Sequence, residues 1–216
     1  EGRSDIMVYD YKKKTTTPFT QTHDREYSPT LTPDGNYISC ILQRDDGAQD
    51  LVKYPINGGD PVVLIDSLIV GYHVWVDDQR LLLFVLGEPI TLREYNVATG
   101  AQKIIDRNVG RSLHRIPGTN DISYVRKVSE TKWELVWWDP VTGVGIHAAD
   151  MLPGREDYAW TPYETILSSD GKDLYAIDLR NGTGRWEKVK VSAPLKGITR
   201  LAIHPEGTRI AVVVEE

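Results

Sequence analysis

Cysteine is almost absent from this chain of 216 residues, which contains Cys40 alone. A single cysteine excludes an internal disulfide and a cysteine-rich metal site. Cys40 lies within the strand-like run 37–42, so we expect a buried, unreactive thiol. The motifs of nucleotide-binding loops, zinc peptidases and nucleophile elbows are also missing. We therefore assign no catalytic residue and expect neither a cofactor nor a metal ion.

Basic residues are fewer than acidic residues in this chain. The chain has 25 Lys and Arg against 31 Asp and Glu, a formal net charge of -6, and its one basic run is the short turn 12–14. We therefore expect no nucleic-acid partner. Long apolar runs are missing too, since the densest, 81–86, is far shorter than the roughly 18 residues that a spanning helix needs. We expect no membrane insertion.

Helical periodicity is absent, and the chain alternates short strand patterns with tight turns. The sharpest example is 27–39, where two strand patterns flank the turn Pro33-Asp34-Gly35. Pro33 presets φ for the turn, and Gly35 accepts the positive φ that strains most other residues. Weaker copies of this turn follow at intervals of 44, 42, 44 and 42 residues, centred on Asp78, Asn120, Glu164 and Glu206.

Each complete copy of the repeat holds four strand patterns. A period of roughly 40 to 45 residues with four strands is typical of a β-propeller blade. The four complete copies predict strands at 27–31, 37–43, 50–56 and 61–66; 71–76, 80–86, 91–97 and 101–106; 112–116, 122–126, 133–139 and 144–149; and 158–161, 165–169, 173–179 and 186–191. The last copy has its late turn at 181–184.

Incomplete copies stand at the two ends of the chain. Two strand patterns, 6–11 and 15–20, open it, and two more, 198–204 and 209–214, close it. Together they make one four-stranded blade, with 6–11 beside 209–214. The sequence therefore predicts an all-β, five-bladed propeller of four-stranded antiparallel blades as a single domain, 1–216. A six-bladed propeller with one blade missing is the alternative.

The repeat resembles a known family. Residues 27–38 are similar to the Ser-Pro-x-x-(Ser/Thr)-Pro-Asp-Gly-x-x-Ile motif of TolB-type, WD-repeat-like propellers, and 204–211 resembles a second, degenerate copy. The late turns 95–100 and 138–143 resemble the second half of such repeats. The resemblance implies a bacterial protein, periplasmic or otherwise exported. Members of the TolB-type family bind proteins or small ligands, or gate a peptidase, and usually have six blades.

The candidate binding site is one mouth of the channel that the first strands of the blades would line. Two residues before the large apolar anchors Trp75, Ile116 and Trp160 stand His73, His114 and Tyr158. Loops between blades add charge beside them, including Arg111 and Asp157. We expect these five residues to bind a ligand, with imidazoles that donate, accept or change charge near pH 6 to 7.

Three functions fit these observations. The first is a non-catalytic binding or scaffolding propeller, a monomer whose partner is a protein, a small molecule or a glycan. The second is a glycoside hydrolase, which requires two carboxylates facing each other across the channel mouth. Glu26 and Asp157 are the nearest candidates for that pair. The third is the gating propeller of a peptidase.

Overall fold

The computed structural model describes residues 3–180, 184–192 and 195–215, so most of the turn expected at 181–184 lies outside the described residues. All regular elements within these ranges are β-strands, as the alternating patterns predict. Nothing helical in this part of the chain is long and apolar enough to cross a membrane.

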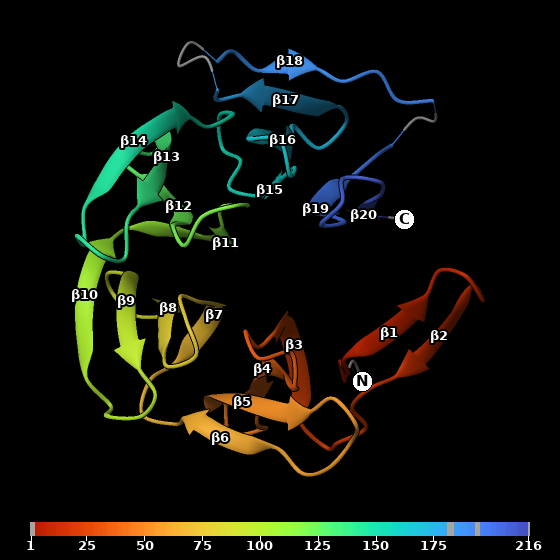
Figure 1. The fold of residues 1–216 in the computed structure, drawn as a ribbon, viewed down its shortest axis with the longest axis vertical. Helices are drawn as coiled ribbons and strands as arrows, with labels where there is room; N and C mark the ends of the chain where they lie inside the picture. Colours follow the sequence, from red (N-terminus) through yellow and green to blue (C-terminus); the bar gives the residue numbers. More distant parts are fainter. Residues whose placement is uncertain (1–2, 181–183, 193–194, 216) are drawn as a thin grey trace. The chain divides into compact units, whose positions relative to one another are not determined.

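The chain divides into two compact units, residues 1–105 and 106–216. In unit 1, β1 and β2 form a two-stranded sheet, and two four-stranded sheets follow with their strands in chain order (Figure 1). The strands are β1 (Met7–Asp10), β2 (Thr15–Pro18), β3 (Arg25–Leu31), β4 (Tyr37–Gln43), β5 (Gln49–Pro55), β6 (Val62–Ile65), β7 (Val70–Trp75), β8 (Arg80–Val85), β9 (Thr91–Asn96) and β10 (Gln102–Arg107), the last of which crosses the boundary between the units.

Unit 2 mirrors this organisation in reverse. Two four-stranded antiparallel sheets come first, and the two-stranded sheet of β19 and β20 ends the chain. The strands are β11 (Val109–Arg115), β12 (Ile122–Lys127), β13 (Trp133–Trp138), β14 (Gly145–Asp150), β15 (Tyr158–Trp160), β16 (Thr165–Ser169), β17 (Leu174–Asp178), β18 (Glu187–Lys188), β19 (Ile198–Ile203) and β20 (Ile210–Val214).

Tight turns with Asp or Asn at their start end the strands where the sequence predicts. Asp34 accepts a hydrogen bond from the amide of Asn36 at 3.1 Å, and Gly35 adopts φ 70°. Asn96 accepts from the amides of Ala98 and Thr99, both at 3.0 Å. These side chains satisfy amides that have no ladder partner, and a short turn therefore suffices to reverse the chain.

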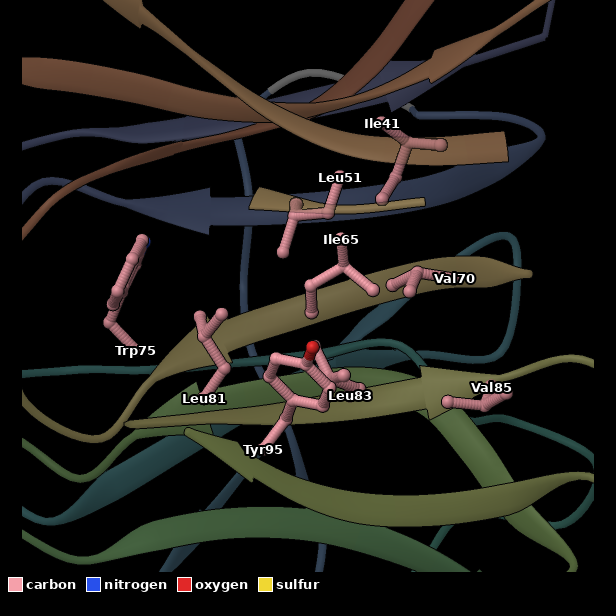
Figure 2. Packing of buried hydrophobic residues seen from close by; sticks show 9 residues of the cluster. All are labelled: Ile41, Leu51, Ile65, Val70, Trp75, Leu81, Leu83, Val85 and Tyr95. Atoms are coloured by element: carbon pink, nitrogen blue, oxygen red, sulfur yellow. The ribbon is translucent and has the colours of Figure 1, made fainter. Parts of the chain in front are cut away.

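The core of unit 1 lies between its two four-stranded sheets. Figure 2 shows Ile41, Leu51 and Ile65 pointing towards side chains of the following sheet, among them Leu81 and Leu83. Burial of each such side chain stabilises the fold by about 1.5–3 kcal/mol. Cys40, Leu42 and Val52 are buried in a second cluster, so both faces of β4 and β5 are covered.

Unit 2 repeats this packing between its own two four-stranded sheets. Side chains from the first sheet meet aromatic and branched side chains of the second, and the buried members of the cluster are Ile116, Val125, Leu135, Ala149, Met151, Tyr158, Trp160, Ile166 and Ile177. The fourth strand of the second sheet is the one clear departure from prediction. β18 covers only Glu187–Lys188 instead of 186–191, because most side chains of this segment are exposed and Trp186 alone packs against the core of unit 2.

Candidate functional site

A buried serine joins the two four-stranded sheets of unit 1. Ser39 of β4 accepts a hydrogen bond from Trp75 Nε1 of β7 at 2.9 Å, and His73 Nε2 lies 2.7 Å from the same oxygen. The Ser39 hydroxyl itself donates to the Thr30 carbonyl at 3.1 Å. Since a hydroxyl has one proton, His73 must donate from Nε2. Its Nδ1 is then a buried acceptor without a partner among the described residues.

Unit 2 contains the same arrangement two repeats later in the chain. Ser123 of β12 accepts from Trp160 Nε1 at 2.8 Å and from the Tyr158 hydroxyl at 2.9 Å, both of β15. Ser123 donates to the His114 carbonyl at 3.3 Å. His73 and Tyr158 are therefore equivalent residues that hold a first strand against the preceding sheet. We call Ser39 and Ser123 the inter-sheet serines.

His114 lies one residue out of phase with His73 and Tyr158. Its ring contacts the Tyr158 ring of the following sheet edge-on, with centroids 4.7 Å apart, while Leu113 is buried on the opposite face of β11. Successive strand residues point to opposite faces, so a shift of one residue changes the neighbour of the side chain. The sequence alignment on Ile116 was therefore off by one, and His114 faces a cavity rather than a serine.

That cavity, the apolar groove, runs along the first strands β11, β15 and β19 and has a volume of about 390 Å³. His114 and Trp160 contribute its aromatic surface. The remaining lining residues are Arg115, Pro117, Ala159, Pro162, Leu201, Ala202, Ile203, His204 and Pro205. Most of these side chains are apolar, so the groove offers contact area with few fixed hydrogen-bonding groups.

A smaller cavity of about 100 Å³ adjoins the groove and shares Leu201 with it. Arg111, Arg155 and Arg200 line this arginine pocket together with Asp157. Asp157 Oδ2 accepts from Arg111 Nη2 at 3.0 Å and from Arg200 Nη1 at 3.1 Å. Asp157, which directly precedes β15, thus joins this strand to β11 and β19. The pocket has three guanidinium groups and one carboxylate.

A second carboxylate fixes Arg111 from the other side. Glu156 Oε1 lies 3.3 Å from Arg111 Nε, and Glu156 Oε2 lies 3.1 Å from Lys127 Nζ. Gly110 leaves room beside it, because a Cβ there would lie 3.0 Å from Val125 Cβ and 3.2 Å from Glu156 Cβ. The surrounding charges therefore hold the Arg111 guanidinium in place at the edge of the pocket.

Burial keeps both predicted imidazoles neutral near pH 7. It lowers the pKa of His73 to about 3. It also lowers the pKa of His114 to about 4, against the opposing effects of the Asp157 carboxylate and a hydrogen bond with the Tyr158 backbone. A change of imidazole charge near pH 6 to 7 is therefore not expected at either position.

The structure brings together part of the predicted site. Arg111, His114 and Asp157 line the adjoining cavities of unit 2. Tyr158 is buried behind them, and His73 is buried in unit 1. Sequence reasoning missed Arg200, although it occupies the same place before its turn as Asp157 does. Opposite charges at equivalent positions of successive repeats were the available signal.

Glu26, one of the carboxylate pair considered for a glycosidase, lies in β3 and is buried rather than exposed on a loop. Its carboxylate is buried in unit 1, where it accepts hydrogen bonds from Thr20 and Tyr54, each at 3.2 Å, and from Thr22. Asp157 carries its ion pairs in unit 2. Among the described residues that line the two cavities, Asp157 is the one carboxylate.

Comparison with solved structures identifies the architecture. TolB from Acinetobacter baumannii matches with a TM-score of 0.74 at 12% identity, over 98% of this chain and 54% of that one. A chain of the nidogen/laminin complex matches at 0.73 and 8% identity, over 94% and 77%. An oligogalacturonate lyase in complex with manganese matches at 0.68 and 14% identity, over 98% and 68%.

These structural neighbours are six-bladed β-propellers, so the four-stranded antiparallel sheets of this chain have a β-propeller fold. The chain spans about half the length of the TolB chain. No family model matches the sequence, and no curated protein matches it. Binding proteins and enzymes share the fold, which therefore leaves the role of this chain to its own residues.

Proposed function

We propose that this protein is a non-catalytic binding propeller that takes its ligand along the apolar groove and the arginine pocket of unit 2. The observation that carries the proposal is the excess of guanidinium groups over carboxylates beside an apolar surface. Three arginines and one aspartate line the pocket. A nucleophile or an acid–base pair would need a second titratable partner within hydrogen-bonding reach, and the described lining supplies none.

The ligand has an anionic group next to an apolar stretch. Guanidinium groups bind carboxylates and phosphates through paired, charge-assisted hydrogen bonds. Arg155 and Arg200 are the arginines best placed for this role, because Arg111 carries both Glu156 and Asp157, whereas Arg200 shares Asp157 alone and Arg155 donates to the Asp170 carbonyl. Trp160, Pro162 and Pro205 then cover the apolar part of the ligand. A peptide segment of a protein partner with an acidic residue or a free C-terminus meets both requirements.

The ring around this site has five blades in our proposal. The equal spacing of the repeated turns supports that number, and the two-stranded sheets β1–β2 and β19–β20 supply the two halves of the closing blade. Because the structural neighbours are six-bladed, a six-bladed propeller with one blade missing is the alternative. We further propose an exported, periplasmic monomer, on the strength of the TolB-type repeat.

The test is selection of peptides from a phage-displayed random library on the purified chain. We expect enriched sequences to pair Asp, Glu or a C-terminal carboxylate with apolar residues. Arg155→Ala and Arg200→Ala should each weaken binding of a selected peptide by about tenfold, the value of a charge-assisted hydrogen bond. Arg180→Ala is the matched control, because Arg180 pairs with Asp178 on an exposed turn.

Two results would overturn the proposal. One is enrichment of neutral or basic peptides, and the other is unchanged affinity in the Arg155→Ala, Arg200→Ala double variant. A panel of glycans tests the second function in parallel. Release of sugar by the parent chain but not by Asp157→Asn would replace the binding role with a glycosidase. Capture of a peptidase would favour the gating role instead.

A further inference from the structure

A separate cluster of ligand-type side chains lies on β13 and β14, at the opposite side of their sheet from β11 in strand order. Glu134 belongs to β13, and His147 and Asp150 belong to β14. One nitrogen or oxygen from each lies within 4.8 Å of the others. His147 Nε2 is already 3.0 Å from Asp150 Oδ1. This cluster plays no part in the groove or the arginine pocket.

A β-bulge creates the cluster. Residues three apart on a regular strand point to opposite faces, so His147 and Asp150 would normally diverge. The register pairs Leu135 with Ala149 but Val136 with His147, which leaves Ala148 as an extra residue. The extra residue returns His147 to the face that carries Asp150 and its direct partner Glu134. Bulges often redirect a side chain in this way.

The imidazole is specific to this sheet, whereas the bulge is not. In the first four-stranded sheet, Leu51 pairs with Ile65 and Val52 with Val63, so β6 has the same break in register. Val63 stands there at the position of His147. The bulge thus occurs in two of the four-stranded sheets, and of these two only the sheet of β11 to β14 places an imidazole between two carboxylates.

We propose that Glu134, His147 and Asp150 bind a divalent transition-metal ion. One imidazole nitrogen with two carboxylates suits Zn²⁺, whereas Ca²⁺ and Mg²⁺ prefer oxygen alone. Metal bonds of about 2.0–2.2 Å require only small rotations of His147 and Asp150, which are exposed. Three protein ligands leave a coordination position open for water or for a donor from another molecule.

Lys132 forms an ion pair with Glu134, and this ion pair must break before Glu134 can bind the metal ion. Lys132 Nζ lies 2.9 Å from Glu134 Oε1, so this carboxylate already faces a positive charge. Removing the ammonium group should leave Glu134 free to coordinate.

Calorimetric titration of the chelator-treated, full chain with ZnCl₂ tests the site. We expect one saturable site, weakened about tenfold or more by His147→Ala, in line with the effects of altered metal ligands and their supports. Asp150→Asn should weaken it as well, and Lys132→Ala should strengthen it. His23→Ala, which removes an exposed imidazole of unit 1, is the matched control and should change nothing.

Folding is checked in each variant by its melting temperature and its circular dichroism without metal. The proposal fails if the parent shows no saturable binding. It also fails if folded His147→Ala and Asp150→Asn both bind Zn²⁺ as the parent does. Since neither variant touches the groove, the outcome is independent of the peptide selection described above.

Discussion

Each inter-sheet serine makes more than one hydrogen bond, so replacing it leaves several groups without a partner. Ser39→Ala removes the acceptor of two buried donors, the Trp75 indole and the His73 imidazole. Leaving such groups unsatisfied costs about 1–3 kcal/mol. We expect Ser39→Ala and Ser123→Ala each to lower the free energy of unfolding by that amount, measured by urea denaturation.

A double-mutant cycle separates the serine's hydrogen bonds from loss of its volume. Trp75→Phe removes the indole donor but keeps an aromatic ring. The Ser39→Ala, Trp75→Phe pair should therefore show a coupling of about 1 kcal/mol, in the range of residues that share a hydrogen bond. Strict additivity of the two changes would contradict the shared-acceptor role.

Protonation of His73 should destabilise unit 1 in acid. Its pKa is near 6.5 in an unfolded chain and is lowered by burial to about 3 in the fold. Stability from the neutral imidazole is complete above pH 6.5 and is lost as the pH falls towards 3, by up to about 1.4 kcal/mol per pH unit. His73→Gln should flatten this part of the pH profile of urea unfolding. An unchanged slope in the variant would contradict the assignment.

At the scale of elements, the turns made the strands predictable. Short Asp- and Asn-led turns fix where each strand ends, so the predicted strands are found within a few residues of their expected bounds, apart from the shortened β18. Register was harder, because the turns after the first strands differ in length. The amide of Ile116 donates to the Asp121 carbonyl, five residues on, whereas Val76 after β7 donates to Arg80, four residues on, so the repeat spacing placed the facing of His114 one residue off. The repeat spacing placed Arg200 and Asp157 at equivalent positions, but whether the two side chains meet depends on their facing and needed the structure.

Asp157 holds three first strands together while it neutralises part of the arginine pocket. Asp157→Asn keeps the shape but removes the charge. We expect a small loss of stability, about 1 kcal/mol or less because the pairs are partly exposed. Inorganic phosphate should at the same time raise the melting temperature of Asp157→Asn more than that of the parent, since the variant lacks the negative charge that Arg111 and Arg200 share.

A matched variant checks that this is a property of the pocket. Asp178→Asn also frees an arginine, but on an exposed turn away from the lining residues. Phosphate should stabilise it no more than it stabilises the parent. An equal response of the two variants would mean that phosphate acts on net charge alone.

At the scale of the molecule, the repeat spacing was the strongest signal in the sequence. Turn centres 44, 42, 44 and 42 residues apart predicted four-stranded antiparallel sheets, and the structure has them. Ring closure is a longer-range property, because it joins strands about 200 residues apart. Local turn chemistry says nothing about such a pairing, and it stays a prediction that β1 lies beside β20.

Residue-resolved hydrogen exchange of β20 tests the closed ring most directly. In the sheet of β19 and β20, alternate amides of an edge strand face away from its partner. Pairing with β1 in a closing blade would protect those outward amides too. We predict slow exchange at every amide of Ile210–Val214, independent of protein concentration. Fast exchange at alternate residues of β20 would contradict closure of the ring by β1.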